Sequence, residues 1–184
     1  MKSMSKRQQG FTLIELVIVI IILGLLAATA LPRFLNVTEQ AENVSVEGTA
    51  GGFASAVGLV RASWEVAGRP AGAGGVVNVD YDGVNVSVAT ANGFPAGGTT
   101  VAALTAVSCQ NVLNTIFQQT PTSSTTAVTA AELAAVSFYV RTAAGECIYH
   151  QTSGLTAAPA NNATSNGFVY NPATGQVSSF LNKP

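Results

Sequence analysis

The chain has 184 residues, enough for one domain with a modest core and appended segments. Charged residues make up only 9% of it, against roughly 25% in an average soluble domain. The formal net charge of −1 argues against nucleic acid or an anionic membrane surface as a bulk electrostatic partner. A surface this poor in charge predicts that lipid or neighbouring protein subunits cover much of it.

The basic residues of the N-terminus gather in front of a long apolar run. Lys2, Lys6 and Arg7 all precede Phe11, and residues 11–31 contain a single charged residue. A helix of that length, at about 1.5 Å per residue, covers the roughly 30 Å hydrocarbon core of a bilayer. The basic residues should stay in the cytoplasm and leave the C-terminal part outside the inner membrane. The run is too long for an ordinary secretory signal, and no Ala-x-Ala-like site follows it.

Glu15 is the charged residue within this apolar run. Its segment offers no basic partner before Arg33, about 27 Å further along a helix. Cleavage after Gly10 would create a new α-amine at Phe11, spaced i, i+4 from Glu15 on one helical face. That amine could meet the carboxylate within one chain or between adjacent chains. From these residues alone, a carboxylate that reaches toward the lipid headgroups at a helix end remains an alternative.

The sequence Gly10-Phe11-Thr12-Leu13-Ile14-Glu15-Leu16 resembles the cleavage and methylation motif of type IV pilins and pseudopilins, and Gly24 and Pro32 continue the likeness. The resemblance implies cleavage after Gly10 and N-methylation of Phe11 by a prepilin peptidase. It implies that Glu15 neutralises the amine of a neighbouring subunit during assembly. It also suggests that the stretch between Gly24 and Pro32 unwinds in the filament, although a simple proline kink is the alternative.

The resemblance divides the chain into a cleaved leader at 1–10, a transmembrane and assembly helix at 11–35, and a globular head at 36–184. The expected product is the structural subunit of a type IVa pilus, a helical homopolymer that supports adhesion, attachment and motility. Its implied partners are other pilin subunits, the prepilin peptidase, the inner membrane, an assembly platform in that membrane, a cytoplasmic ATPase and an unidentified receptor. The precursor belongs in the inner membrane of a Gram-negative bacterium, and the assembled subunit belongs in an extracellular pilus.

Three alternatives to a major pilin remain open. The N-terminus does not separate a pilin from a pseudopilin of a type II secretion system, or a major from a minor pilin. A membrane-tethered periplasmic binding protein or enzyme would explain the tether, but not a basic leader that ends at Gly10.

Beyond Pro32, apolar residues recur every three or four positions until Gly68-Arg69-Pro70, which is a stop signal. One helix from Phe11 to about Ala67 is therefore predicted. Its second half is amphipathic and should lie against a sheet. The predicted fold class is α+β, a long N-terminal helix packed against an antiparallel sheet.

The C-terminal part contains three predicted hairpins. Residues 76–81 and 84–88 flank Asp82-Gly83, a preferred type I′ turn, and this register pairs Tyr81 with Val84, Val79 with Val86 and Val77 with Val88. Residues 135–141 and 146–151 form the second hairpin, and residues 168–170 and 176–180 form the third. A short helix at 109–118, capped by Ser108, and a loop at 120–129 are also predicted.

Cys109 and Cys147 show no CxxC or metal-like spacing. In an exported protein they are predicted to form one disulfide, with two buried free thiols as the alternative. Their spacing and the turn at 170–175 look closest to mannose-sensitive haemagglutinin-type pilins, a resemblance that implies a variable, disulfide-bounded region here.

Catalytic chemistry is not predicted. His150 is the one histidine, on a predicted strand, and no nucleophile-elbow, phosphate-loop or zinc motif appears. Asp80 and Asp82 lack the downstream acidic ligand of a calcium loop. The sequence therefore predicts a protein that is not an enzyme and that needs no metal or cofactor.

Overall fold

The computed structural model describes residues 11–98 and 104–183, apart from the side chains of residues 35 and 36. The chain divides into two compact units, residues 1–42 and residues 43–184. Helix α1 (Leu13–Val66) runs through both units and contains Pro32. The predicted long helix is confirmed, with its start at Leu13 in place of Phe11 and its end one residue before the predicted Ala67.

Within the unit of residues 43–184, one face of α1 forms the centre of the core. The buried residues recur every three or four positions, as the amphipathic pattern predicted: Val46, Ala50, Phe53, Val57, Val60 and Trp64. The ring of Phe53 is fully buried and lies 5.2 to 5.4 Å, centroid to centroid, from three aromatic rings of the larger sheet, those of Tyr149, Phe168 and Tyr170. Helix and sheet therefore share one apolar core.

The first hairpin follows a short 3₁₀ turn, Ala73–Gly75, and consists of β1 (Val76–Tyr81) and β2 (Val84–Ala89). Its register is the predicted one: Tyr81 pairs with Val84, Val79 with Val86 and Val77 with Val88. The turn residues Asp82 and Gly83 both have positive φ, 52° and 79°, as a type I′ turn requires.

The remaining strands form a second sheet in the order β3-β4-β5-β6-β7. The sequence predicted an antiparallel sheet and did not separate the first hairpin from the other strands. Its strands are β3 (Ser123–Ser124), β4 (Phe138–Ala143), β5 (Glu146–Gln151), β6 (Asn166–Asn171) and β7 (Gln176–Leu181). The pairs from β4 to β7 are antiparallel, so the two predicted hairpins are confirmed, but β3 pairs with β4 in parallel.

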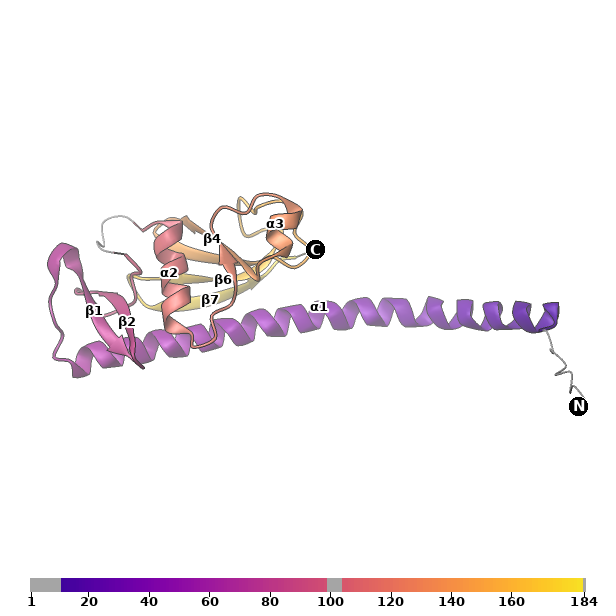
Figure 1. Ribbon diagram of the computed structural model, residues 1–184, viewed down its shortest axis with the longest axis horizontal. Coiled ribbons are helices and arrows are strands. Elements are labelled where there is room, and N and C mark those ends of the chain that lie inside the picture. The colour runs from indigo at the N-terminus through magenta and orange to yellow at the C-terminus, as the bar shows by residue number, and fades with distance from the viewer. Residues whose placement is uncertain (1–10, 99–103, 184) are drawn as a thin grey trace, which may run out of the picture. The chain divides into compact units, whose positions relative to one another are not determined.

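Two helices lie between these strands in sequence, α2 (Ala106–Ile116) and α3 (Ala130–Ala134). Helix α2 starts three residues earlier than predicted because Thr105, not Ser108, is its N-cap. Ser108 is the third residue of the helix and completes the capping box by accepting a hydrogen bond from the backbone of Thr105. Figure 1 shows α2 between the β1–β2 hairpin and the larger sheet, and it contacts strands of both.

Two predictions in this region are corrected. Strand β3 lies within the predicted loop at 120–129, and helix α3 occupies the residues directly before Ala135, the predicted start of the next strand. A second capping box, Thr129 with Glu132, begins α3. Its C-terminal turn continues to Val136, whose N–H donates to the carbonyl of Leu133, and β4 can begin only beyond it, at Phe138.

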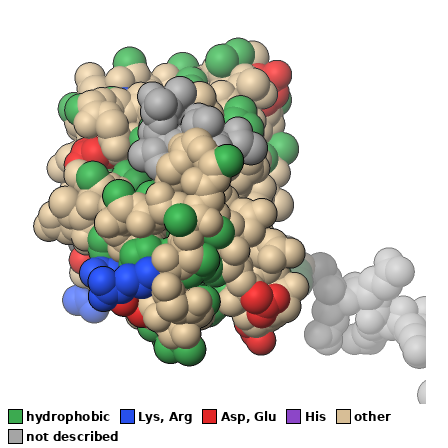
Figure 2. Space-filling view, turned by 90° about the vertical axis from the view of Figure 1, so that its left-hand side faces the viewer, with side chains coloured by type: hydrophobic (Ala, Val, Ile, Leu, Met, Phe, Trp, Pro, Cys, Tyr) green, Lys and Arg blue, Asp and Glu red, His purple; other side chains and the backbone are tan. Residues whose placement is uncertain are grey.

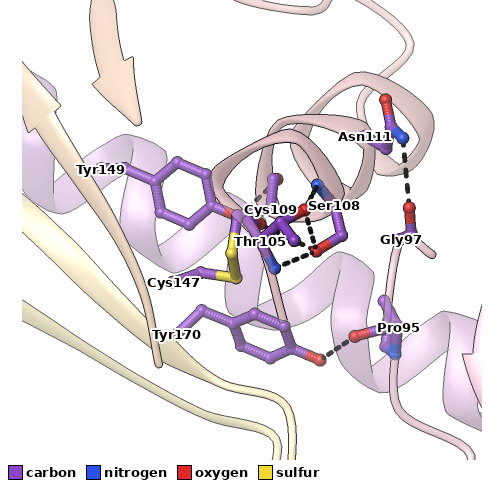
Figure 3. The surroundings of a disulfide bond; sticks show 9 residues. All are labelled: Pro95, Gly97, Thr105, Ser108, Cys109, Asn111, Cys147, Tyr149 and Tyr170. Carbon is purple, nitrogen blue, oxygen red and sulfur yellow. Dashed lines mark hydrogen bonds between the residues drawn. A yellow bond between two sulfur atoms is a disulfide. The ribbon is translucent and has the colours of Figure 1, made fainter. Parts of the chain in front are cut away.

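The predicted disulfide is present and joins α2 to β5. Cys109 and Cys147 are fully buried, with their Cα atoms 5.4 Å apart. Figure 3 shows two tyrosines beside it: Tyr149 Oη donates to the carbonyl of Cys109 at 2.8 Å, and Tyr170 Oη donates to the carbonyl of Pro95 at 2.9 Å. Burial raises the pKa of both phenols above their usual 10, so both stay protonated and can donate.

Candidate functional site

The first part of α1 presents apolar side chains to its surroundings on every side. All residues from 11 to 34 are exposed, and Phe11 is 91% exposed. Among the described residues, α1 is the helix that is long and apolar enough to cross a membrane. An apolar surface of this size is unfavourable in water, so this segment requires lipid or protein around it.

Glu15 is held at the start of this helix by Thr12. The backbone N–H and the side-chain hydroxyl of Thr12 each donate to Glu15 Oε2, both at 2.8 Å. In return, the backbone N–H of Glu15 donates to Thr12 Oγ1 at 3.3 Å. Together these reciprocal bonds form a capping box, which satisfies backbone donors that the first turn of a helix leaves unpaired.

The two predicted processing residues, Gly10 and Phe11, directly precede Thr12 in the sequence. Gly10 lies outside the described residues, and Phe11 precedes the first residue of α1, Leu13. Pairing between Glu15 and the amine that cleavage would create at Phe11 stays a prediction. In the uncut precursor the nitrogen of Phe11 belongs to the peptide bond with Gly10, and the Thr12 donors take its place at Glu15.

Gly24 and Pro32 both lie inside the continuous helix α1. A methyl group added at Gly24 would meet no atom within 4 Å, so nothing in the described chain requires a glycine there. Unwinding of the stretch between them in a filament stays a prediction.

Thr12 is the residue of this site that the sequence reasoning missed. Thr12 and Glu15 match the Ser/Thr-x-x-Glu/Gln signature that precedes an apolar helical run, and this pattern was available in the sequence.

A polar cluster in the head surrounds the fully buried His150. Arg141 Nε donates to His150 Nε2 at 2.8 Å, and Arg141 Nη2 donates to Asn162 Oδ1 at 2.6 Å. Because Nε2 accepts a hydrogen bond, the neutral ring carries its proton on Nδ1, which donates to Ser165 Oγ at 2.8 Å. Burial, and secondarily the Arg141 guanidinium, lower the pKa of His150 to about 4. The ring is therefore a hydrogen-bonded structural element of the core.

This cluster predicts a loss of stability in acid. The unfolded chain takes up a proton at His150 near pH 6.5, while the folded chain does so only near pH 4. The free energy of unfolding should therefore fall by about 3 kcal/mol as the pH drops from 6.5 to 4. Denaturant titration of the detergent-solubilised full-length chain at each pH measures this fall, and His150→Gln, which does not titrate, should show a clearly smaller one. An equal fall in the free energy of unfolding of the wild type and of His150→Gln would show that protonation of His150 does not cause it.

Comparison with known proteins agrees with the geometry of the N-terminus. Residues 5–31 match the family described as the prokaryotic N-terminal methylation motif. This match contains Gly10, Phe11, Glu15 and Gly24, and it covers the exposed apolar part of α1 as far as Leu31. This signature supports a type IV pilin precursor.

Relatives of the chain agree with this signature. Over 53 residues it is 51% identical to the type IV narrow pilus major component PilA5 of Thermus thermophilus. The aligned stretch covers 29% of this chain and 46% of that protein. Over 90 residues it is 40% identical to the fimbrial protein EcpC of Eikenella corrodens, an alignment that covers 47% of this chain and 59% of that protein. Over 59 residues it is 39% identical to the type II secretion system core protein G of Pseudomonas aeruginosa, an alignment that covers 32% of this chain and 42% of that protein.

The chain spans about half the length of these relatives. No solved structure matches the chain significantly. The names of the three relatives describe pilus and secretion-system proteins, in agreement with the prediction that the chain is not an enzyme.

Proposed function

We propose that this chain is the structural subunit of a type IV pilus. The observation that carries the proposal is the exposed apolar segment of α1, which has one capped carboxylate near its start and lies inside the methylation motif as far as residue 31. Such a segment can reside in a bilayer before assembly and in the core of a filament afterwards. Because both surroundings are apolar, little hydrophobic free energy is lost when the subunit moves from one to the other.

Processing creates the assembly-competent subunit in this proposal. A prepilin peptidase cuts after Gly10 and methylates the new amine of Phe11, and the amine then pairs with Glu15 of a neighbouring subunit. A cytoplasmic ATPase acts through a platform in the inner membrane to extract the subunit. The stretch between Gly24 and Pro32 unwinds as the filament forms. The product is an extracellular pilus of a Gram-negative bacterium, which supports adhesion and motility.

The head is the part of the subunit that the filament displays. Figure 2 shows one face on which charged side chains appear only as small separate groups among apolar and uncharged polar surface. A surface of this kind suits contact with neighbouring subunits and is consistent with the charged content of 9%. The likeness to mannose-sensitive haemagglutinin-type pilins stays part of the proposal, and it concerns this head.

A pseudopilin of a type II secretion system is the second candidate, and the identity of 39% to core protein G favours it. The Cys109–Cys147 disulfide and the long C-terminal unit favour a pilin instead. We expect a major pseudopilin to have a shorter head that carries a calcium loop. A minor pilin shares all these features.

Electron microscopy of cells that lack the gene separates these candidates. Loss of surface filaments, restored by the wild-type gene, is the expected result for a major pilin. Normal filaments together with a block in protein secretion would contradict the proposal and indicate a pseudopilin.

A further inference from the structure

Arg141 of strand β4 is a half-buried cation that has only neutral hydrogen-bond partners. Its Nε donates to His150 Nε2 at 2.8 Å, and its Nη2 donates to Asn162 Oδ1 at 2.6 Å. The ion pairs among the described residues all involve Glu65, and none of them includes Arg141. Burial lowers the pKa of the Arg141 guanidinium, because its charge is partly removed from water without an acidic partner in the described chain. An anion from outside the chain would offset this cost.

The guanidinium of Arg141 still has free donors at the surface. Two of its five N–H groups make the bonds to His150 and Asn162, which leaves both N–H groups of Nη1 and one of Nη2 without a partner in the described residues. Among those residues, the side-chain atom that is both buried and unpaired is Gln151 Oε1, so Nη1 is accessible from outside. Two neutral contacts therefore hold the guanidinium in place, while its terminal nitrogens can bind a carboxylate.

Glu146, an acidic residue on the same face of the sheet, has a different partner. Successive residues of a strand point to opposite faces, so Arg141 shares a face with Ile148, with which it pairs, and with Glu146 two positions away on β5. Glu146 Oε1 accepts a hydrogen bond from Asn171 Nδ2 at 3.2 Å. The carboxylate of Glu146 therefore does not neutralise Arg141.

Tyr139 is the aromatic neighbour of Arg141 on this face. Tyr139 and Arg141 alternate with the buried Phe138 and Val140 along β4, so both point away from the core that the sheet shares with α1. The ring of Tyr139 lies 6.3 Å, centroid to centroid, from the ring of His150, to which Arg141 donates. Both Tyr139 and Arg141 are half-buried. An aromatic ring and a fixed cation therefore lie together on the face of the sheet that is turned away from α1.

We propose that Tyr139 and Arg141 form a binding site for a sugar acid, with its carboxylate on the terminal nitrogens of Arg141 and a sugar ring against Tyr139. The inference rests on the proposed function, in which α1 lies inside the filament and this face meets the surface to which the pilus attaches. A planar carboxylate matches the fork of an arginine, and an aromatic ring offers an apolar surface to the C–H groups of a sugar. From residue 11 onward the chain has five basic and nine acidic residues, which does not favour nucleic acid as the ligand.

Binding of tri-galacturonate to the detergent-solubilised full-length subunit tests this site, with the fully methyl-esterified trimer as the uncharged probe. In a saturation-transfer NMR titration, the wild type should bind the acid at least about tenfold more tightly than the ester. Arg141→Gln should weaken binding of the acid by about tenfold, and Tyr139→Ala by about threefold. Tyr139→Phe, which keeps the ring, should bind like the wild type.

Arg61→Gln is the matched control. Arg61 also lies over an aromatic ring, with its Cζ 4.7 Å from the ring centroid of Phe94, but Glu65 is its acidic partner. It should bind tri-galacturonate as tightly as the wild type. The fluorescence of Trp64 checks that each variant is folded. If Arg141→Gln is not folded, Arg141→Lys, which keeps the charge but loses the fork, takes its place and should also bind the acid more weakly.

Several results of this titration would overturn the site. They are no binding of the acid to the wild type at about 10 mM, equal binding of acid and ester, and equal losses in Arg61→Gln and Arg141→Gln. Tighter binding of a DNA oligonucleotide that is lost in Arg141→Gln would show a phosphate site and also overturn the sugar acid. Because the titration uses separate subunits, it does not depend on filaments. Normal filaments in cells that lack the gene would contradict the proposed function and leave these binding results unchanged.

Discussion

Glu15→Ala is expected to leave the precursor inserted and cleaved but to lower the yield of pili by at least about tenfold, because an amine in apolar surroundings is left without its partner. The apolar run of α1 is unchanged by this substitution, and alanine is a good helix former, so insertion should be preserved. Immunoblots of membrane and sheared filament fractions measure the two quantities separately.

Glu39→Ala provides the matched control for this variant. Glu39 is also an exposed glutamate of α1, but it lies beyond the apolar segment. We expect it to assemble at wild-type yield. Wild-type amounts of pili from Glu15→Ala would contradict pairing between the carboxylate and the amine, and equal losses in both variants would show that the effect is not specific to Glu15.

Removing the disulfide with Cys109→Ala and Cys147→Ala together is expected to lower the free energy of unfolding by about 4 kcal/mol. The bond joins residues 38 positions apart, so it removes much of the loop-closure entropy of the unfolded chain. It also anchors α2 to β5 in a region that is fully buried. Denaturant unfolding of the detergent-solubilised full-length subunit, followed by the fluorescence of Trp64, measures the change.

Reduction of the wild-type protein with a thiol reagent gives an independent comparison. Trp64 is the one tryptophan and is 5% exposed, so its emission reports on the core of the head. Reduced wild type and the double variant should unfold at similar denaturant concentrations. A difference of less than about 1 kcal/mol between oxidised wild type and the double variant would contradict a stabilising role for the bond.

The elements that could be predicted are those in which two local signals agree. The β1–β2 hairpin combines strict alternation with an Asp-Gly turn, and its register was correct residue by residue. Helix α1 combines a long periodic pattern with a glycine and proline stop, and both ends were within two residues. The disulfide followed from two cysteines in an exported chain.

The elements that were missed depend on partners distant in sequence or on short local caps. Strand β3 has two residues and exists only because it pairs with β4, which no local pattern reveals. The hydrogen bond between the buried residues His150 and Ser165 likewise joins two separate parts of the chain, and no local pattern reveals it. The capping box at Thr129 was visible in the sequence, but a five-residue helix has too short a pattern to stand out.

The candidate site was predicted only in part. Glu15 stood out because a carboxylate within an apolar run is costly and needs a partner. Thr12 was overlooked because a threonine beside an apolar run has no such cost, and its role became clear only from the two bonds to Oε2.

Mass spectrometry of the subunit N-terminus in purified native filaments tests the central claim most directly. The expected subunit begins at residue 11 with N-methylated phenylalanine. A subunit that retains residues 1–10, or one that is found only as separate molecules and never in filaments, would contradict it.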